Sequence, residues 1–281
     1  MPGRTTKKRG RLFLIGGAAR LSLLRFVRLA GGSRAHVVVV PHASSAPATA
    51  ARDLQKDLLK AGAGKVSLLM PWSPDGLPAG ATAVLMAGGD QSRLVKGVRQ
   101  PLRASLEEFF EAGGLLAGTS AGAAAMPVTM IAEGMSDGML RPGSLRLKPG
   151  FGFFQGTVVD THFKERSRFG RLMAAVTLLP GTLGIGLDED TALEVCADGT
   201  ATVHGNGHAW FFVPGAGHAS NLAVASAKLK ASVAGIEVSS LCDGERFDLR
   251  ARRWIKSQQG SNAPKQVDTG DISGGERFSP R

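Results

Sequence analysis

Short apolar runs alternate with amphipathic helical patterns along the first 120 residues of this chain, and this alternation constrains the fold more than any other feature. The apolar runs are continuous, which indicates strands buried on both faces of a sheet. Patterns with apolar residues three and four positions apart separate the runs and predict helices. Strands that alternate with helices are typical of a parallel sheet covered on both sides. The sequence therefore predicts an α/β fold.

The expected elements of this part can be read directly from the pattern. The strands are expected at 11–17, 36–45, 65–72, 82–90 and 115–118. The helices are expected at 21–32, 48–62 and 102–114, with inward-facing residues Leu54, Leu58 and Leu59 in the second and Leu106, Phe109 and Phe110 in the third. Sites in parallel sheets lie at the carboxyl ends of the strands. Those ends are predicted at 16–18, 41–45, 88–91 and 118–122.

The second half of the chain has a different pattern. Residues 126–154 have no defined periodicity, 157–163 read as a strand, and 168–179 read as a helix with one apolar face, formed by Phe169, Leu172, Met173 and Val176. β segments are expected at 184–195, 201–212 and 231–241. The polar ends lack apolar periodicity. We therefore predict a flexible basic N-terminus over 1–10, a single α/β domain over 11–256 and a flexible tail over 257–281.

Composition limits the location of the protein. The chain has 281 residues, of which 43% are hydrophobic, which is enough for a large core. Cys196 and Cys242 are too few and too far apart for a disulfide framework or a metal site, so a reduced, cytoplasmic setting is expected. The N-terminal apolar run, Leu12 to Ile15, is too short for a signal peptide or a membrane span. No membrane association is expected.

The net charge of +11 suggests nucleic acid as a partner. The basic residues are scattered, however, and with 6% aromatic residues and no tyrosine the chain has few side chains on which bases could stack. We interpret the charge as a solvated surface with a local anion-binding cluster. Nucleic acid is not the expected partner.

The stretch LLAGTSAGAAAM, 115–126, places Ser120 between two glycines, after an apolar run and before a helix-forming one. This order is typical of a nucleophile elbow, in which a serine lies on a sharp strand-to-helix turn. Gly118 and Gly122 would let the backbone pass close by at that turn. The alternative is that these glycines only end a strand and begin a helix. The five-residue pattern alone leaves both readings open.

A serine nucleophile needs a base, and the chain has six histidines. His36 opens an apolar strand and is expected to be structural, whereas His42 follows a strand end and is compatible with a site or a loop. Histidines of the late β region are expected in turns or at the surface; they are His204, His208 and His218.

His162 differs because it follows Asp160 and precedes the basic run FKERSRFGR. A core histidine beside an exposed helix face would explain these residues equally simply. Yet Arg166, Arg168 and Arg171 cannot share one helical stripe. Three guanidinium groups beside a histidine favour a pocket for carboxylate or phosphate.

Four segments together resemble one family: GGDQ, GTSAGA, DTHFKERSRFGRL and GIGLDEDTAL, in this order. They are similar to the cyanophycinase branch of the serine peptidases, which also include aspartyl dipeptidases, and the similarity covers Arg11 to about Val213. The resemblance implies a three-layer α/β/α sandwich with a flavodoxin-like, mostly parallel sheet, related to class I glutamine amidotransferases. It also implies peptide hydrolysis through an acyl-enzyme, with no metal or organic cofactor.

The resemblance assigns roles to individual residues. Ser120 becomes the nucleophile, His162 its base and Glu189 the acid that orients the histidine. Five positions match the family's substrate pocket: Gln91, Asp160, Arg166, Arg168 and Arg171. Backbone N–H groups near Gly89 and at Ala121 are expected to stabilise the oxyanion.

Two departures from the family pattern concern the substrate. The first strand ends in GGAAR, at 16–20, where the family commonly has two acidic residues after the small ones. Thr161 stands where cyanophycinases typically have glutamine.

We therefore expect a serine exopeptidase that releases β-Asp-Arg dipeptides from cyanophycin, a polyaspartate whose side chains carry arginine. In that interpretation the arginines bind the carboxylates and Asp160 suits the guanidinium. An aspartyl or isoaspartyl dipeptidase is the alternative within the enzyme class. A non-hydrolytic anion- or nucleic-acid-binding relative is the alternative outside it. The resemblance also implies a homodimer.

Overall fold

The computed structural model describes residues 10–18, 20–73, 75–134, 143, 145–222 and 231–256. The predicted flexible segments therefore lie outside the described residues, except for Gly10, which is buried. Within these ranges, no helix is both long enough and apolar enough to cross a membrane.

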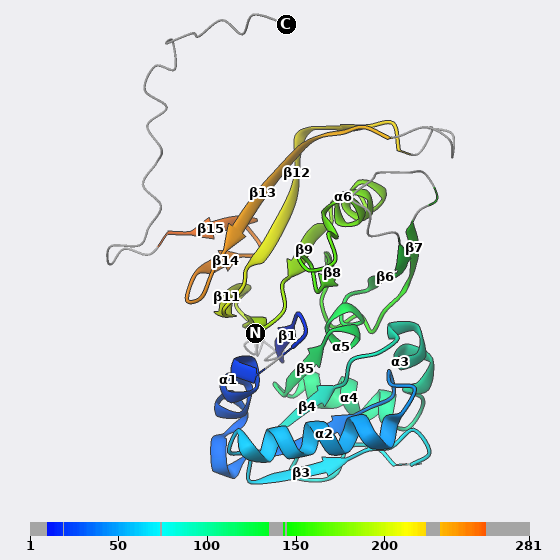
Figure 1. Cartoon of the computed structure of the whole chain (residues 1–281), viewed down its shortest axis with the longest axis vertical. Coiled ribbons are helices and arrows are strands. Elements are labelled where there is room, and N and C mark those ends of the chain that lie inside the picture. The colour runs from blue at the N-terminus through cyan, green and yellow to red at the C-terminus, as the bar shows by residue number, and fades with distance from the viewer. Residues whose placement is uncertain are drawn as a thin grey trace, which may run out of the picture.

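The main sheet has nine strands and extends from the base of the molecule to about its middle in Figure 1. Its strand order is β15-β14-β11-β10-β1-β5-β4-β2-β3. The parallel strands are β1 (Arg11–Ile15), β2 (His36–Val40), β3 (Lys65–Leu68), β4 (Ala83–Met86) and β5 (Leu115–Thr119). The antiparallel strands are β10 (Thr191–Val195), β11 (Thr200–Gly205), β14 (Arg246–Asp248) and β15 (Arg253–Ile255).

The main sheet is thus mixed, whereas the sequence predicts a mostly parallel one. Among the described residues, no helix lies between β10 and β15 that could carry the chain back across the sheet. Parallel neighbours need such a crossover, so these strands pair antiparallel through short connections. The α/β class is confirmed, and the parallel part holds the five strands that the alternation predicts.

Helices cover both faces of the parallel strands. α1 (Arg20–Ala30) and α2 (Pro47–Lys60) pack on one face. A short 3-10 helix, η1 (Gly32–Arg34), follows α1. α3 (Gln91–Gly97), α4 (Leu102–Glu111) and α5 (Ala121–Ala124) lie on the other face. Leu58 is fully buried in α2 as predicted, but Leu59 is 48% exposed, because it follows Leu58 by only 100° around the helix.

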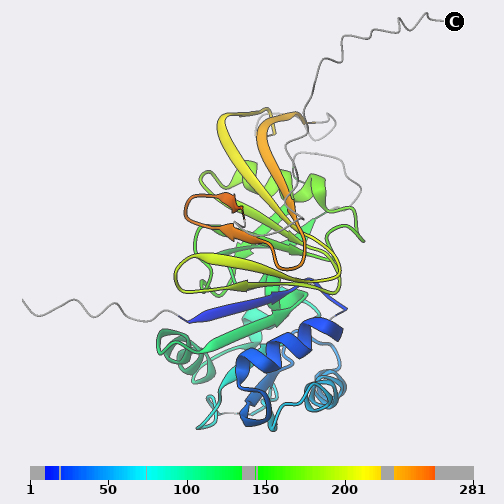
Figure 2. The same ribbon diagram turned by 90° about the vertical axis from the view of Figure 1, so that its left-hand side faces the viewer.

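A second, four-stranded sheet has the order β13-β12-β9-β8. Figure 1 shows α6, β8 and β9 above the parallel strands, and Figure 2 shows the long β12–β13 hairpin from the side. Its elements are β8 (Thr157–Thr161), α6 (Phe169–Leu178), β9 (Leu183–Leu187), β12 (Ala209–Ser220) and β13 (Val233–Leu241). A separate hairpin joins β6 (Thr129–Gly134) and β7 (Leu145–Pro149) in the stretch that had no predicted periodicity.

Two of the predicted β segments each divide into two strands. Residues 184–195 divide into β9 and β10, which belong to different sheets, and 201–212 divide into β11 and β12. The first break lies at Asp188–Asp190, where Asp190 has a positive φ of 48° that ends the extended backbone. Apolar residues continue on both sides of each break, so the pattern conceals it.

One hydrophobic core nevertheless joins the two sheets. Leu187 and Phe211 of the second sheet belong to the same buried cluster as Leu193, Val203 and Phe247 of the main sheet. A smaller cluster around Phe163 and Phe212 lies between the second sheet and α6. The sheets therefore form one packed unit, and the site lies where they meet.

Candidate active site

Ser120 lies on a sharp turn between β5 and α5. Its backbone has φ 51° and ψ −112°, a conformation that side chains rarely adopt. A Cβ added to Gly118 would overlap the backbone of Gly122, and one added to Gly122 would overlap the carbonyl of Met86. Both glycines are thus required for the close backbone approach that the Gly-x-Ser-x-Gly pattern predicts.

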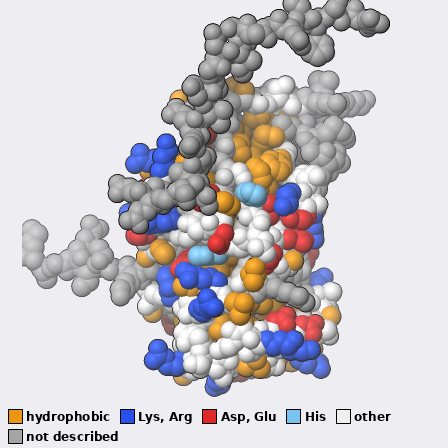
Figure 3. Space-filling model, turned by 60° about the vertical axis from the view of Figure 1, so that its left-hand side comes forward, with side chains coloured by type: hydrophobic (Ala, Val, Ile, Leu, Met, Phe, Trp, Pro, Cys, Tyr) orange, Lys and Arg blue, Asp and Glu red, His pale blue; other side chains and the backbone are white. Residues whose placement is uncertain are grey.

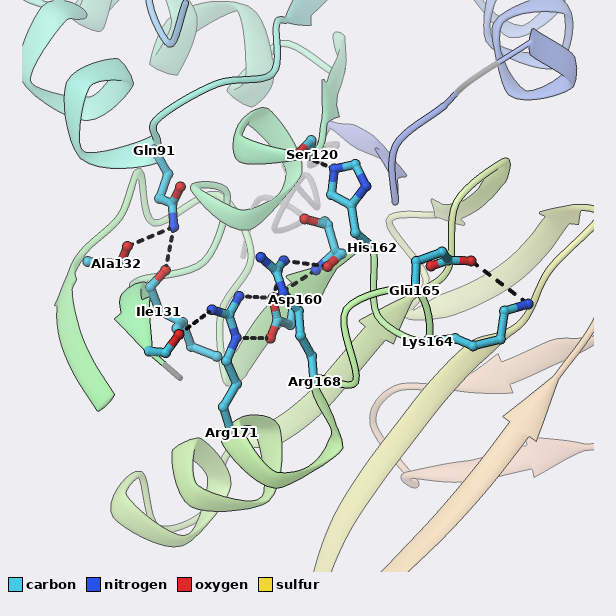
Figure 4. A network of polar contacts seen from close by, with 12 residues as sticks. Gln91, Ser120, Ile131, Ala132, Asp160, His162, Lys164, Glu165, Arg168 and Arg171 are labelled. Atoms are coloured by element: carbon cyan, nitrogen blue, oxygen red, sulfur yellow. Dashed lines mark hydrogen bonds and ion pairs between the residues drawn. The ribbon is translucent and has the colours of Figure 1, made fainter. Parts of the chain in front are cut away.

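Three side chains form a continuous chain of hydrogen bonds here (Figure 4). The Ser120 Oγ lies 2.8 Å from His162 Nε2. The opposite ring nitrogen, Nδ1, lies 2.6 Å from Glu189 Oε1. The His162 side chain is 13% exposed, while that of Glu189 is 38% exposed. This is the arrangement of a nucleophile, a base and an acid that orients the base.

The end of β1 aligns these three residues through consecutive carbonyl groups. The Ile15 carbonyl accepts the N–H of Ser120 at 2.9 Å, and the Gly16 carbonyl accepts that of His162 at 2.8 Å. The Gly17 carbonyl accepts the N–H of Asp190, next to Glu189, at 2.8 Å. Strand β1 therefore fixes Ser120 from the main sheet and His162 and Glu189 from the second sheet in one frame.

Gly17 also lies flat against the imidazole ring. A Cβ added there would come closer than 3.0 Å to three ring atoms of His162. At Gly16, an added Cβ would overlap the backbone carbonyl of Asp188. The two glycines thus admit the histidine and the acid-bearing loop. Ala19 and the side chain of Arg20, where the family departure lies, are outside the described residues.

Sequence reasoning missed Asp188, a fully buried carboxylate beside the acid. It accepts the backbone N–H groups of Lys164 and His208 and the indole N–H of Trp210, each at 3.1 Å. It thereby joins the loop after His162 to β12. The feature of the sequence that could have identified it is an acidic residue directly after a buried strand. Glu165 adds a second link, since its carboxylate accepts the N–H of Glu189 at 3.2 Å.

The predicted oxyanion donors border Ser120. The N–H groups of Gly89 and Ala121 donate to no residue in the described ranges, so they are available to a substrate oxygen. A Cβ on Gly88 would lie 3.4 Å from Ser120 Cβ, whereas one on Gly89 would overlap Ala43. Gly88 therefore faces the serine and Gly89 supports the turn. The oxyanion role of Gly89 and Ala121 stays a prediction.

The other predicted residues divide into a buried network and an exposed arginine. Asp160 is 1% exposed and binds Arg171 through two hydrogen bonds, at 2.5 and 2.6 Å. Arg168 Nη1 contacts the same carboxylate at 3.1 Å and donates to the Thr161 carbonyl at 2.5 Å. Arg166 is exposed and has no acidic partner in the described part of the chain.

This network lies directly below His162 in Figure 4. Burial lowers the pKa of Arg168 to about 10, while the Asp160 carboxylate opposes that shift. In the part of the chain that the structure describes, the buried Nε of Arg168 has no hydrogen-bond partner. Gln91 reaches from α3 to β6 instead, where its amide donates to the carbonyls of Ile131 at 2.7 Å and Ala132 at 3.1 Å.

The remaining histidines do not reach Ser120. His42 is 5% exposed at the end of β2, its Nδ1 has no hydrogen-bond partner among the described residues, and burial lowers its pKa. His36 binds the Ser67 hydroxyl at 2.8 Å, a structural role as predicted. His204 lies on β11 and pairs with Glu194 at 2.9 Å, so it is not a turn residue. In the described ranges no group of three or more acidic, His or Cys side chains is placed to hold a metal ion.

Comparison with known proteins identifies the family. The sequence profile of peptidase family S51 matches residues 12–203. The chain belongs to this family. It is therefore a serine peptidase of family S51, and the Ser120 elbow, His162 and Glu189 all fall within the matched residues.

Relatives cover most of the chain. The cyanophycinase of Synechococcus elongatus is 32% identical over 263 residues, which is 87% of this chain and 81% of the relative. The cyanophycinase of Trichormus variabilis is 32% identical over 256 residues, or 86% of each chain.

Two solved structures share the fold of this S51 peptidase. A peptidase from an acI-B1 Actinobacterium aligns with a TM-score of 0.58 at 20% identity and covers 86% of this chain and 98% of its own. A putative peptidase E from Listeria monocytogenes aligns with a TM-score of 0.50 at 16% identity and covers 70% and 99%.

Proposed function

We propose that this S51 peptidase hydrolyses cyanophycin to β-Asp-Arg dipeptides. The observation that carries the proposal is the hydrogen-bonded series Ser120–His162–Glu189 in a chain that is 32% identical to cyanophycinases over most of its length. The basic side chains beside His162 suit the free carboxylate that each β-Asp-Arg unit presents.

The geometry is suited to acyl transfer in two steps. His162 Nε2 takes the Ser120 proton as Oγ attacks the backbone carbonyl, and Nδ1–H donates to Glu189 throughout. The N–H groups of Gly89 and Ala121 would stabilise the oxyanion. His162 then returns the proton to the leaving amine. Water, activated by the same nitrogen, releases the acyl group from Ser120.

The contacts of Asp160 change the expected roles in the substrate pocket. The sequence interpretation gave Asp160 to the substrate guanidinium, but this carboxylate already accepts hydrogen bonds from Arg168 and Arg171. We propose that Asp160 instead holds these two arginines in place below His162. Arg166, exposed and without an acidic partner in the described residues, is then the arginine available to a substrate carboxylate.

A release assay tests the function. The purified chain is incubated with cyanophycin, and products are identified by mass spectrometry, with Ser120→Ala as the inactive control. We expect β-Asp-Arg dipeptides from the wild type alone. Release from short aspartyl or isoaspartyl peptides, with none from the polymer, would favour the dipeptidase and overturn the proposal.

The substitution Arg166→Lys tests the pocket. Lysine keeps the charge but loses the planar fork that binds a carboxylate through two hydrogen bonds. We expect kcat/KM for the polymer to fall about tenfold to a hundredfold, or roughly 1.5–3 kcal/mol. Labelling of Ser120 by a small fluorophosphonate should not change, because that probe carries no carboxylate. Arg52→Lys, an exposed position on α2, is the matched control. Unchanged turnover in Arg166→Lys would contradict this role.

The homodimer and the cytoplasmic setting stay predictions. Light scattering of the purified chain during size-exclusion chromatography would measure its mass against the 29.2 kDa of one chain.

A further inference from the structure

A basic groove lies next to the active site, between α3 and the β6–β7 hairpin. It has a volume of about 480 Å³ and is open to solvent. Four of the side chains along it are cationic and two are acidic: Arg93, Lys96, Arg99, Lys148, Asp90 and Glu133. None of these positions belongs to the hydrogen-bonded series of Ser120 or to the arginine network below it.

The two acidic side chains are already engaged. Asp90 caps α3, where its carboxylate accepts the N–H of Arg93 at 2.7 Å. Glu133 lies 3.5 Å from Arg146 and 3.8 Å from Lys148. One cation of the groove, Lys148, is therefore paired with Glu133, and neither carboxylate forms an ion pair with Arg93, Lys96 or Arg99.

Three cations of the groove lack acidic partners in the described part of the chain. Arg93, Lys96 and Arg99 are exposed and form no ion pair there. They are spaced three residues apart, so Arg93 and Lys96 lie on one face of α3, and Arg99 follows its end. This differs from the face in Figure 3, where basic and acidic side chains are interspersed.

A short stretch of chain connects the groove to the site. Gly88 lies against Ser120, and Asp90, two residues later, lines the groove. Gln91 connects this point to the carbonyls of Ile131 and Ala132 on β6 (Figure 4). An extended chain bound at Ser120 would thus meet the groove within a few residues.

We propose that this groove binds the free carboxylates of polymer units that lie beyond the unit being cleaved. The inference rests on the proposed function for its substrate. Guanidinium and ammonium groups on an open surface bind carboxylates through charge-assisted hydrogen bonds. A row of such groups can bind a long peptide that carries a carboxylate at every residue. A short peptide bound at Ser120 would not extend into the groove.

The test measures binding of fluorescently labelled poly-L-aspartate to the full-length Ser120→Ala protein by anisotropy at physiological salt. Two double variants are compared in that background. The groove variant carries Lys96→Glu and Arg99→Glu, and the α2 variant carries Arg52→Glu and Lys56→Glu. The second pair is exposed on α2 and changes the net charge equally. Thermal unfolding first establishes that both variants are folded.

We expect the groove variant to weaken binding by about tenfold or more, and the α2 variant by less than about threefold. The same groove changes in the active enzyme should raise KM for the polymer. Equal losses in the two variants would show a diffuse charge effect and overturn the groove. Tighter binding of a single-stranded oligonucleotide than of polyaspartate, lost in the groove variant, would assign the groove to nucleic acid and also overturn the proposal.

The outcome separates this inference from the proposed function. If polyaspartate binds through the groove but the chain releases nothing from cyanophycin, the groove proposal stands and the proposed substrate is wrong. If dipeptides are released but the two charge variants do not differ in binding or in KM, the proposed substrate stands and the groove proposal is wrong.

Discussion

Two residues in strained or crowded positions, Ser120 and Gly17, determine whether the site is assembled. Ser120 holds a positive φ because the turn requires it, and Gly17 lacks a side chain because the His162 ring occupies that space. The contacts of each residue do not explain its conformation, because that conformation positions another group.

Replacing Ser120 separates chemistry from strain. Ser120→Ala should abolish hydrolysis and keep the strained backbone, whereas Ser120→Gly should abolish hydrolysis and relieve it. We expect the glycine variant to be more stable than the alanine variant by about 1 kcal/mol, measured by urea denaturation. At Ser92, within α3, the order should reverse, because glycine costs about 0.5–1 kcal/mol in a helix. Alanine more stable at both positions would contradict the strain at Ser120.

Gly17→Ala should displace the imidazole ring. A shift of about 1 Å in a catalytic group costs on the order of a hundredfold in rate, so we expect that loss in kcat/KM and in fluorophosphonate labelling of Ser120. Gly62→Ala is the control, because Gly62 also has a positive φ, of 93°, but an added Cβ meets no atom within 4 Å. Similar losses in both variants would assign the effect to backbone strain.

At the scale of elements, the sequence predicts what its periodicity encodes. The strands β1, β2, β4 and β5 have continuous apolar runs, and the elbow, the base and the acid lie at or just beyond strand ends. Helix α3 was not predicted, because its seven residues include a single buried apolar one, Leu94. Neither the breaks within the late β segments nor the buried Asp188 could be predicted, because sheet membership and hydrogen-bond partners depend on contacts distant in sequence.

The packing of β2 against α3 makes stability depend on pH through His42. Burial lowers the pKa of His42 below its usual 6.5, and its ring lies against Gly97 of α3. The unfolded chain then binds a proton at a higher pH than the folded one does. The free energy of unfolding should therefore decrease as the pH falls below 6.5.

Urea denaturation of the wild type and of His42→Leu, at about pH 7.5 and about pH 5.5, measures this dependence. We expect the wild type to lose more stability than the variant between the two values. The other histidines are the same in both proteins, so the difference isolates His42. An equal loss would show that the ring becomes protonated without cost in the folded state.

At the scale of the whole molecule, the shared core couples the two sheets. Leu187 and Phe211 pack in the same cluster as Leu193 and Val203, so separating the sheets would expose this apolar surface. We expect the fluorophosphonate labelling rate and the far-ultraviolet circular dichroism to decrease over one urea transition. Loss of labelling at a lower urea concentration, with secondary structure intact, would mean that the sheets separate first.

The three carbonyl groups at the end of β1 have a consequence for synthesis of the chain. Ser120 precedes its base by 42 residues, and the acid follows the base by another 27. The ribosome thus delivers β1 and the elbow well before the groups that activate the serine. We expect ribosome-bound chains that end before Glu189 to resist a fluorophosphonate, and full-length chains to react with it. The order of residues alone would then delay proteolysis until Glu189 has been made.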